Sequence, residues 1–152
     1  MKTIISIFAS ILLLSCNSNQ TLNSSGSNSS NADSPVAYQD TTLYFQRLEG
    51  SANQDTSNIS LTFNGNTVIG HFNHTPYEKD SRRGTITATR NGNTITGIWA
   101  FMQEGLNDTL PVEFKFEANQ LLQKAYSVDQ STGRQILTDT SNFIIYSPVD
   151  KF

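Results

Sequence analysis

The chain of 152 residues has little of the chemistry from which catalytic and metal sites are usually built. It contains one cysteine and two histidines. A single cysteine allows no Cys-x-x-Cys pair and no disulfide within the chain. The chain also has no glycine-rich phosphate loop and no Ser/His/Asp spacing of a nucleophilic triad. We therefore expect no enzyme activity, no catalytic residue, no cofactor and no bound metal.

A strong excess of either charge is missing as well. Lys and Arg together number 10 and Asp and Glu 13, which gives a formal net charge of −3 at pH 7. Binding to nucleic acid or to an anionic membrane surface relies on a basic patch, so neither is expected as an electrostatic partner. Without a disulfide, stability must therefore come from packing, and the chain has 9 Phe, 5 Tyr and 1 Trp to pack. Burying apolar surface stabilises a fold by about 25 cal/mol per Å².

Long hydrophobic runs are scarce too, and the clearest one lies at the start of the chain. Lys2 precedes an apolar stretch over residues 4–14, which ends at Ser15 and Cys16. A positive start, an apolar segment of this length and a small residue at the cleavage point are typical of a secretory signal peptide. A membrane-spanning helix needs about 20 apolar residues, so we predict a signal peptide over residues 1–15.

The residues Leu13-Leu14-Ser15-Cys16 resemble a bacterial lipobox, where a lipoprotein precursor is acylated on its cysteine and then cleaved. The alternative is an ordinary signal peptide with a cysteine nearby. The resemblance implies that Cys16 carries a lipid and anchors the protein to a membrane. Asn17 is not the aspartate that retains many lipoproteins in the inner membrane, and the acidic cluster of surface-exported lipoproteins is absent. We therefore expect an outer-membrane anchor with the domain facing the periplasm.

A polar tract follows the cysteine. Residues 17–35 are mostly Ser, Asn, Gly and Gln, and so little apolar surface cannot offset the entropy lost on ordering. The composition predicts a flexible tether over residues 16–36, with a reach of about 25 Å, and a folded domain over residues 37–152.

The domain has the period-two pattern of β-strands. Residues 59–72 recur as residues 86–99, and both copies place alternating β-branched residues around Asn-Gly, a strong hairpin signal. Gly70 and Gly97 occupy equivalent positions, where the sheet must bend or coil. Further alternating segments lie at residues 43–48, 112–117, 122–128 and 143–146.

About eight strands joined by short turns must close on themselves or pair with a second sheet to bury their apolar face. We predict an all-β antiparallel meander that closes into a lipocalin-like up-and-down barrel, with a β-sandwich as the alternative.

Three motifs resemble a functionally uncharacterised group of small Bacteroidetes lipoproteins. They are Tyr77-Glu78-Lys79-Asp80, Gly84-Thr85-Ile86 and Phe101-Met102-Gln103-Glu104-Gly105. The similarity covers roughly residues 59–117. It implies a lipocalin-like barrel on a lipid anchor, and no activity.

The segment from Tyr77 to Arg83 is the densest charge cluster and links the two hairpins. At the mouth of a barrel it could bind an anionic ligand through Arg82 and Arg83, with Tyr77 and Lys79 as further candidates. The alternative is a solvated loop with weak internal ion pairs.

Trp99 is the remaining candidate. An eight-stranded barrel either fills its interior with side chains or holds one small ligand, so Trp99 either lines a cavity or fills it. His71 and His74, three apart on a strand, point to opposite faces unless the chain turns at Asn73, so we interpret them as surface residues rather than metal ligands.

These observations favour a binding module: an outer-membrane lipoprotein whose barrel takes a small apolar or anionic ligand, or an envelope protein. One alternative is an inhibitor of lysozyme-like enzymes, since small lipid-anchored barrels do this elsewhere. A second is a metal-dependent hydrolytic enzyme, which rests only on His71, His74 and scattered carboxylates.

Overall fold

The computed structural model describes residues 41–152. The predicted signal peptide, the predicted lipidation site Cys16 and the predicted tether lie outside the described residues, as do residues 37–40. The described part contains ten strands and no helix. In chain order the strands are β1 (Thr42–Glu49), β2 (Asp55–Asn64), β3 (Thr67–Thr75), β4 (Arg82–Asn91), β5 (Thr94–Gln103), β6 (Leu106–Glu117), β7 (Gln120–Lys124), β8 (Tyr126–Val128), β9 (Gln135–Leu137) and β10 (Phe143–Val149).

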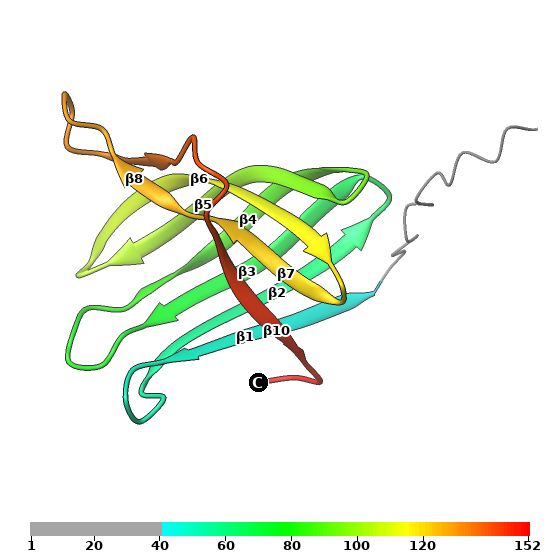
Figure 1. The fold of residues 1–152 in the computed structure, drawn as a ribbon, viewed down its shortest axis with the longest axis horizontal. Helices are drawn as coiled ribbons and strands as arrows, with labels where there is room; N and C mark the ends of the chain where they lie inside the picture. The colour runs from blue at the N-terminus through cyan, green and yellow to red at the C-terminus, as the bar shows by residue number, and fades with distance from the viewer. Residues whose placement is uncertain (1–40) are drawn as a thin grey trace, which may run out of the picture. The chain divides into compact units, whose positions relative to one another are not determined.

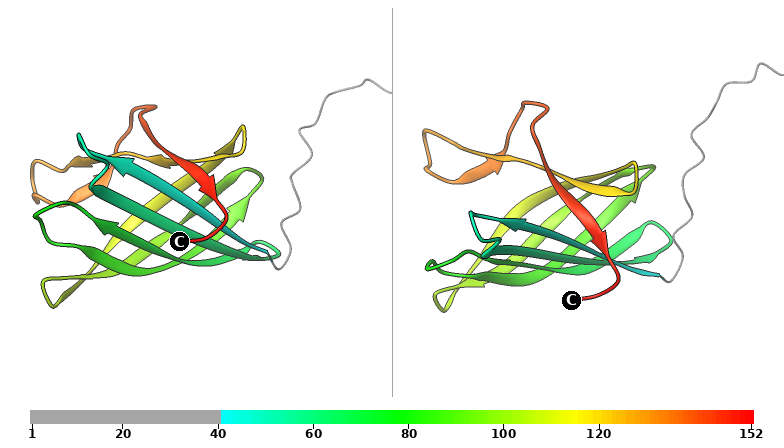
Figure 2. Two further views of the ribbon diagram at one scale, coloured as in Figure 1. Left: turned by 90° about the horizontal axis from the view of Figure 1, so that it is seen from below. Right: turned by 60° about the horizontal axis from the view of Figure 1, so that its bottom comes forward.

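Eight of these strands form a closed antiparallel barrel in the order β1-β10-β7-β6-β5-β4-β3-β2. Strands β1 to β7 follow one another around the wall, and β10 closes it between β7 and β1 (Figure 1; Figure 2). The prediction of a closed up-and-down barrel is confirmed, and the chain does not form the alternative sandwich.

The two repeated segments form the hairpins β2–β3 and β4–β5, as predicted. The two-residue turns are Gly65-Asn66 and Gly92-Asn93, and their glycines have φ values of 57° and 60°. A two-residue turn with glycine at its first position belongs to the turn types whose twist matches the twist of the flanking strands. The turns therefore lie one residue later than the Asn-Gly pairs that signal them.

Gly70 and Gly97 lie inside strands and allow close backbone approach. A Cβ atom at Gly70 would lie 2.0 Å from the Ser60 carbonyl oxygen, and one at Gly97 would lie 2.3 Å from that of Thr87. No side chain fits in this space, so both positions require glycine because neighbouring backbone comes this close.

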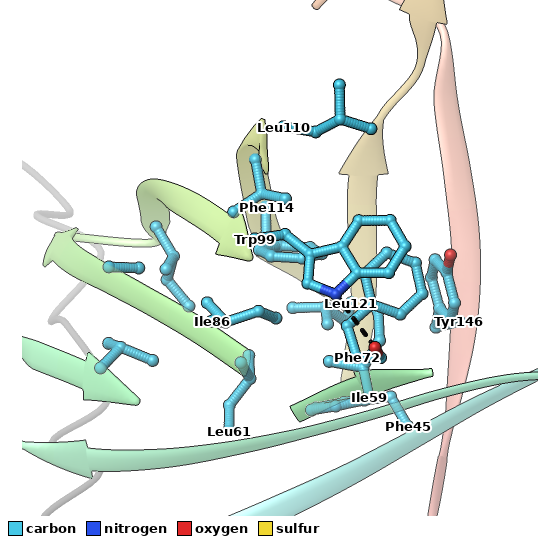
Figure 3. Close-up of a cluster of buried hydrophobic side chains, with 14 of the residues drawn as sticks. Phe45, Ile59, Leu61, Phe72, Ile86, Trp99, Leu110, Phe114, Leu121 and Tyr146 are labelled. Carbon is cyan, nitrogen blue, oxygen red and sulfur yellow. Dashed lines mark hydrogen bonds between the residues drawn. The ribbon is translucent and has the colours of Figure 1, made fainter. Parts of the chain in front are cut away.

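Alternate residues of the barrel strands point inward and form an apolar core centred on Trp99 (Figure 3). The Trp99 ring stacks on Phe72, with 4.2 Å between centroids and 27° between planes, and Phe101 lies 4.4 Å away. The Trp99 indole N–H donates a 3.0 Å hydrogen bond to the Phe72 carbonyl oxygen. The buried apolar residues are Phe45, Ile59, Leu61, Phe63, Val68, Phe72, Ile86, Ala88, Ile95, Trp99, Phe101, Leu110, Val112, Phe114, Leu121 and Tyr146.

Aromatic side chains pack together at the end of the barrel near the two hairpin turns. Phe116 packs against Phe45 and Phe63, with centroid distances of 5.7 and 5.9 Å. The Arg90 guanidinium lies over the Phe63 ring, 5.8 Å from its centroid, and its Nε donates to the Gly92 carbonyl oxygen. Beside these rings, between the start of β1 and the end of β10, lies a hollow of about 250 Å³ that Phe45 and Phe116 help to line.

The single strand predicted over residues 122–128 is wrong. β7 ends at Lys124, and β8 leaves the wall to pair only with β9. Continuing the β6–β7 register, in which Phe114 faces Gln123, would place Tyr126 opposite Pro111. Proline has no N–H to donate to a ladder, so the pairing stops short of it. We call β8, β9 and their connection the ribbon (residues 126–137).

Candidate functional site

A cavity of about 210 Å³ lies at the barrel end opposite the two hairpin turns, and we call this end the mouth. Its floor is apolar and comes from the aromatic core, while its rim is polar and comes from the ends of six strands and the ribbon. The lining residues are Arg47, Glu49, Ser57, Phe72, His74, Arg82, Trp99, Gln123, Tyr126, Gln135, Ile144 and Tyr146.

Arg82, the first residue of β4, is the most extensively bonded of the cavity cations. Its Nε donates to Gln103 Oε1 at 2.7 Å, and its Nη1 donates to Gln135 Oε1 at 2.8 Å. Its guanidinium also lies over the Phe101 ring, 5.2 Å from the centroid. These contacts fix the position of the positive charge at the rim.

The second cation of the cavity is already compensated. Arg47 and Glu49 follow each other at alternate positions of β1, and their side chains form an ion pair at 2.5 Å. Since the pair is half-exposed, it adds little to stability. Its charges cancel locally, so Arg47 contributes little net field to the cavity.

Uncharged polar side chains complete the rim. Ser57 Oγ and His74 Nδ1 share a hydrogen bond of 2.8 Å, and the Tyr146 hydroxyl donates to Gln123 Oε1 at 2.7 Å. Burial, and next the positive charge of Arg82, lower the pKa of His74 below its ordinary value, so its imidazole is neutral at pH 7. Burial raises the pKa of Tyr126 to about 12, which keeps its hydroxyl protonated.

The structure separates the residues that the sequence analysis grouped as a site. Arg82 and Trp99 line the same cavity. Arg83 points to the outer face, because neighbouring residues of a strand point to opposite sides. Tyr77 and Lys79 lie in the exposed β3–β4 loop, where the Tyr77 backbone N–H donates to Asp55 Oδ1.

The sequence analysis missed most of the polar rim. Arg47 shares its face of β1 with the buried Phe45, and Gln123 shares its face of β7 with the buried Leu121. A polar residue at an inward position near a strand end is the signal that could have identified them.

The two histidines do not form a metal site. β3 runs on through Asn73 to Thr75, so His71 is exposed on the outer face while His74 faces the cavity. Within residues 41–152, no group of three or more His, Cys, Asp or Glu side chains is placed to hold a metal ion.

An open groove of about 460 Å³ adjoins the cavity between the β5–β6 turn and the ribbon. Arg82 and Gln135 line both the groove and the cavity. Across the groove, Arg134 of the ribbon forms a 3.0 Å ion pair with Asp108 of β6. The groove therefore connects Arg82 to solvent.

Fold and site together define a small eight-stranded antiparallel barrel with an apolar interior and a polar cavity at one end. Comparison of the chain with family models, curated proteins and solved structures gave no match. Among the described residues, no helix is long and apolar enough to cross a membrane.

Proposed function

We propose that the protein is a binding module that holds a small ligand in the mouth cavity. The observation that carries the proposal is the mouth cavity itself, which combines an apolar floor of stacked core aromatic rings with a polar rim. Ligand sites in proteins commonly combine apolar walls with a few placed polar groups.

The size of the cavity limits the ligand. A volume of about 210 Å³ exceeds the ~150 Å³ of an apolar cavity that admits benzene. It is smaller than the pockets of about 300 Å³ or more that hold drug-sized molecules. A ligand of one ring or a short chain therefore fits better than a long acyl chain.

The proposal includes binding without catalysis, and the cell location expected from the sequence. A lipid on Cys16 and a long polar tether would hold the barrel at the outer membrane, facing the periplasm. Support for the location comes from the lipobox-like residues 13–16 and from the composition of residues 17–35.

The test is a native mass spectrum of the full chain purified from its own envelope, before and after extraction with organic solvent. The proposal predicts an extra, extractable mass of a few hundred daltons or less, because only a small molecule fits. Adding the extract back should restore the mass. A protein with no extractable mass would contradict the proposal.

A further inference from the structure

Arg82 forms no ion pair with a carboxylate of the described residues, although the pKa of Asp108 across the groove is lowered chiefly by the Thr109 backbone N–H and to a smaller extent by the charge of Arg82. Its two hydrogen-bond acceptors, Gln103 and Gln135, are neutral amides. Within residues 41–152 the ion pairs are Arg47–Glu49, Lys115–Glu117, Lys124–Glu113 and Arg134–Asp108. The positive charge at the rim is therefore available to a ligand.

Arg82 is also accessible, because it lies between the cavity and the open groove. A carboxylate makes charge-assisted hydrogen bonds to a guanidinium, and these are roughly twice as strong as bonds to a neutral amide. A ligand carboxylate would thus compete well with Gln103 and Gln135 for the same N–H groups.

The remainder of the site suits an uncharged, apolar group. Below the rim the cavity is walled by the stacked Trp99 and Phe72 rings and by Ile144. His74, next to Arg82 in the β3–β4 register, is neutral at pH 7. Within residues 41–152, Arg82 is a cation that forms no ion pair and lies above an apolar floor, which matches a ligand with one negative charge.

We propose that the ligand is a small organic monocarboxylate, whose carboxylate pairs with Arg82 and whose single ring or short chain lies on the Trp99–Phe72 floor. This inference rests on the proposed function and names the chemical class of its ligand.

The chain offers a built-in reporter and a matched control. Trp99 is its only tryptophan and lines the cavity, so its fluorescence reports occupancy. Arg83 follows Arg82 on β4 but is exposed on the outer face. Arg83→Gln therefore removes the same charge from nearly the same place without changing the cavity.

The experiment titrates the extracted full chain with benzoate and hexanoate, and with their neutral counterparts benzamide and hexanamide. We expect at least one acid to bind about tenfold or more tightly than its amide, since hydrogen bonds to charged groups are worth that much. Arg82→Gln should abolish the preference for the acid while leaving amide binding in place. Arg83→Gln should leave the preference for the acid unchanged. Arg82→Lys, which keeps the charge but loses the planar fork, should retain part of it.

Equal affinity for acids and amides would overturn the carboxylate class, as would an equal loss in the Arg82→Gln and Arg83→Gln variants. If Arg82→Gln does not fold, Arg82→Lys replaces it in the test, and a full acid preference in Arg82→Lys would overturn the paired geometry. If no probe binds but the purified protein still carries an extractable molecule, the monocarboxylate class is wrong, while the proposal that the cavity binds a small ligand is retained. If no probe binds and no molecule can be extracted, both the monocarboxylate class and the proposed binding function are wrong.

Discussion

Individual side chains at the mouth are polar although they point into the barrel, and their neighbours satisfy them. Ser57 bonds to His74, Tyr146 bonds to Gln123, and Arg82 bonds to two glutamines. Among the described residues that are not exposed, no buried side-chain nitrogen or oxygen lacks a hydrogen-bond partner. A buried polar group without a partner costs about 1–3 kcal/mol, so this network lets the rim stay polar without destabilising the fold.

His74 should make the stability of the protein depend on pH. Because its pKa is lowered in the folded state, chiefly by burial, the unfolded chain takes up a proton first as the pH falls. The contribution of neutral His74 is present in full above the unfolded pKa of about 6.5. It is lost progressively as the pH falls from there to the folded pKa. Wild type should therefore lose more stability on acidification from pH 7.5 to 5 than His74→Gln does.

Urea unfolding at the two pH values measures this difference. His71→Gln, on the outer face of the same strand, is the matched control and should behave as wild type. Equal losses of unfolding free energy in wild type and His74→Gln would contradict the assignment.

At the scale of elements, the close approach of β3 to β2 depends on Gly70. An added Cβ would meet the Ser60 carbonyl group as well as Leu61 Cδ2, and backbone in a paired strand cannot shift cheaply. Gly70→Ala should lower the free energy of unfolding by about 3 kcal/mol or more. His71→Ala, at the next and exposed position, should cost less than about 0.5 kcal/mol. Similar midpoints for the two variants in urea would show that the strand does not need this close approach.

The ribbon is an element held to the barrel mainly by side chains. Its Tyr126 hydroxyl donates to the Pro111 carbonyl oxygen at 2.9 Å, its Gln135 accepts from Arg82, and its Arg134 pairs with Asp108. Because β8 and β9 pair only with each other, their amides should exchange with solvent faster than those of β2 to β5.

Removing the Tyr126 hydroxyl tests this attachment. Tyr126→Phe should cost about 1 kcal/mol and increase hydrogen exchange in the ribbon selectively. Tyr44→Phe, a change on β1 away from the ribbon, is the control. Uniform exchange across ribbon and barrel in wild type would contradict a separately attached element.

The sequence predicts some of these elements well and others poorly, for physical reasons. The two hairpins depend on local sequence alone, because alternating residues and a turn glycine define each hairpin whatever the other strands do. The departure of β8 at Ala125 is not local, because residues 122–128 keep alternating and only the Pro111 opposite them stops the pairing. Arg82 points into the cavity and Arg83 points outward because β4 begins at Arg82. The sequence contains no sharp signal for the start of a strand beside a charged loop, so it does not tell the two arginines apart.

At the scale of the whole molecule, the two ends of the barrel differ in the side chains that they carry. The same closed wall carries aromatic side chains toward the turns at Gly65 and Gly92, and polar side chains toward the ribbon. The closing contact is short: β1 pairs with β10 at three positions and with β2 at eight. An interior with this asymmetry suits a site entered from one end.

The proposed membrane anchor also belongs to the scale of the whole molecule, and it rests on Cys16. Cys16→Ala should release the protein from the membrane into the soluble periplasmic fraction, because a lipid is the attachment that the lipobox-like motif implies. Fractionation of cells followed by immunoblotting measures the distribution. Continued membrane attachment of the variant would contradict a cysteine-linked lipid.

The most direct test of the central claim, a ligand in the mouth cavity, compares two tryptophan substitutions on β10. Ile144 lines the cavity, whereas the neighbouring Ile145 is exposed on the outer face. Both variants are purified from the envelope and the fraction carrying a bound small molecule is measured by native mass spectrometry. We predict that Ile144→Trp, which fills the cavity, loses the bound molecule, while Ile145→Trp keeps it as wild type does. Equal occupancy in the two variants would place the ligand elsewhere and contradict the account.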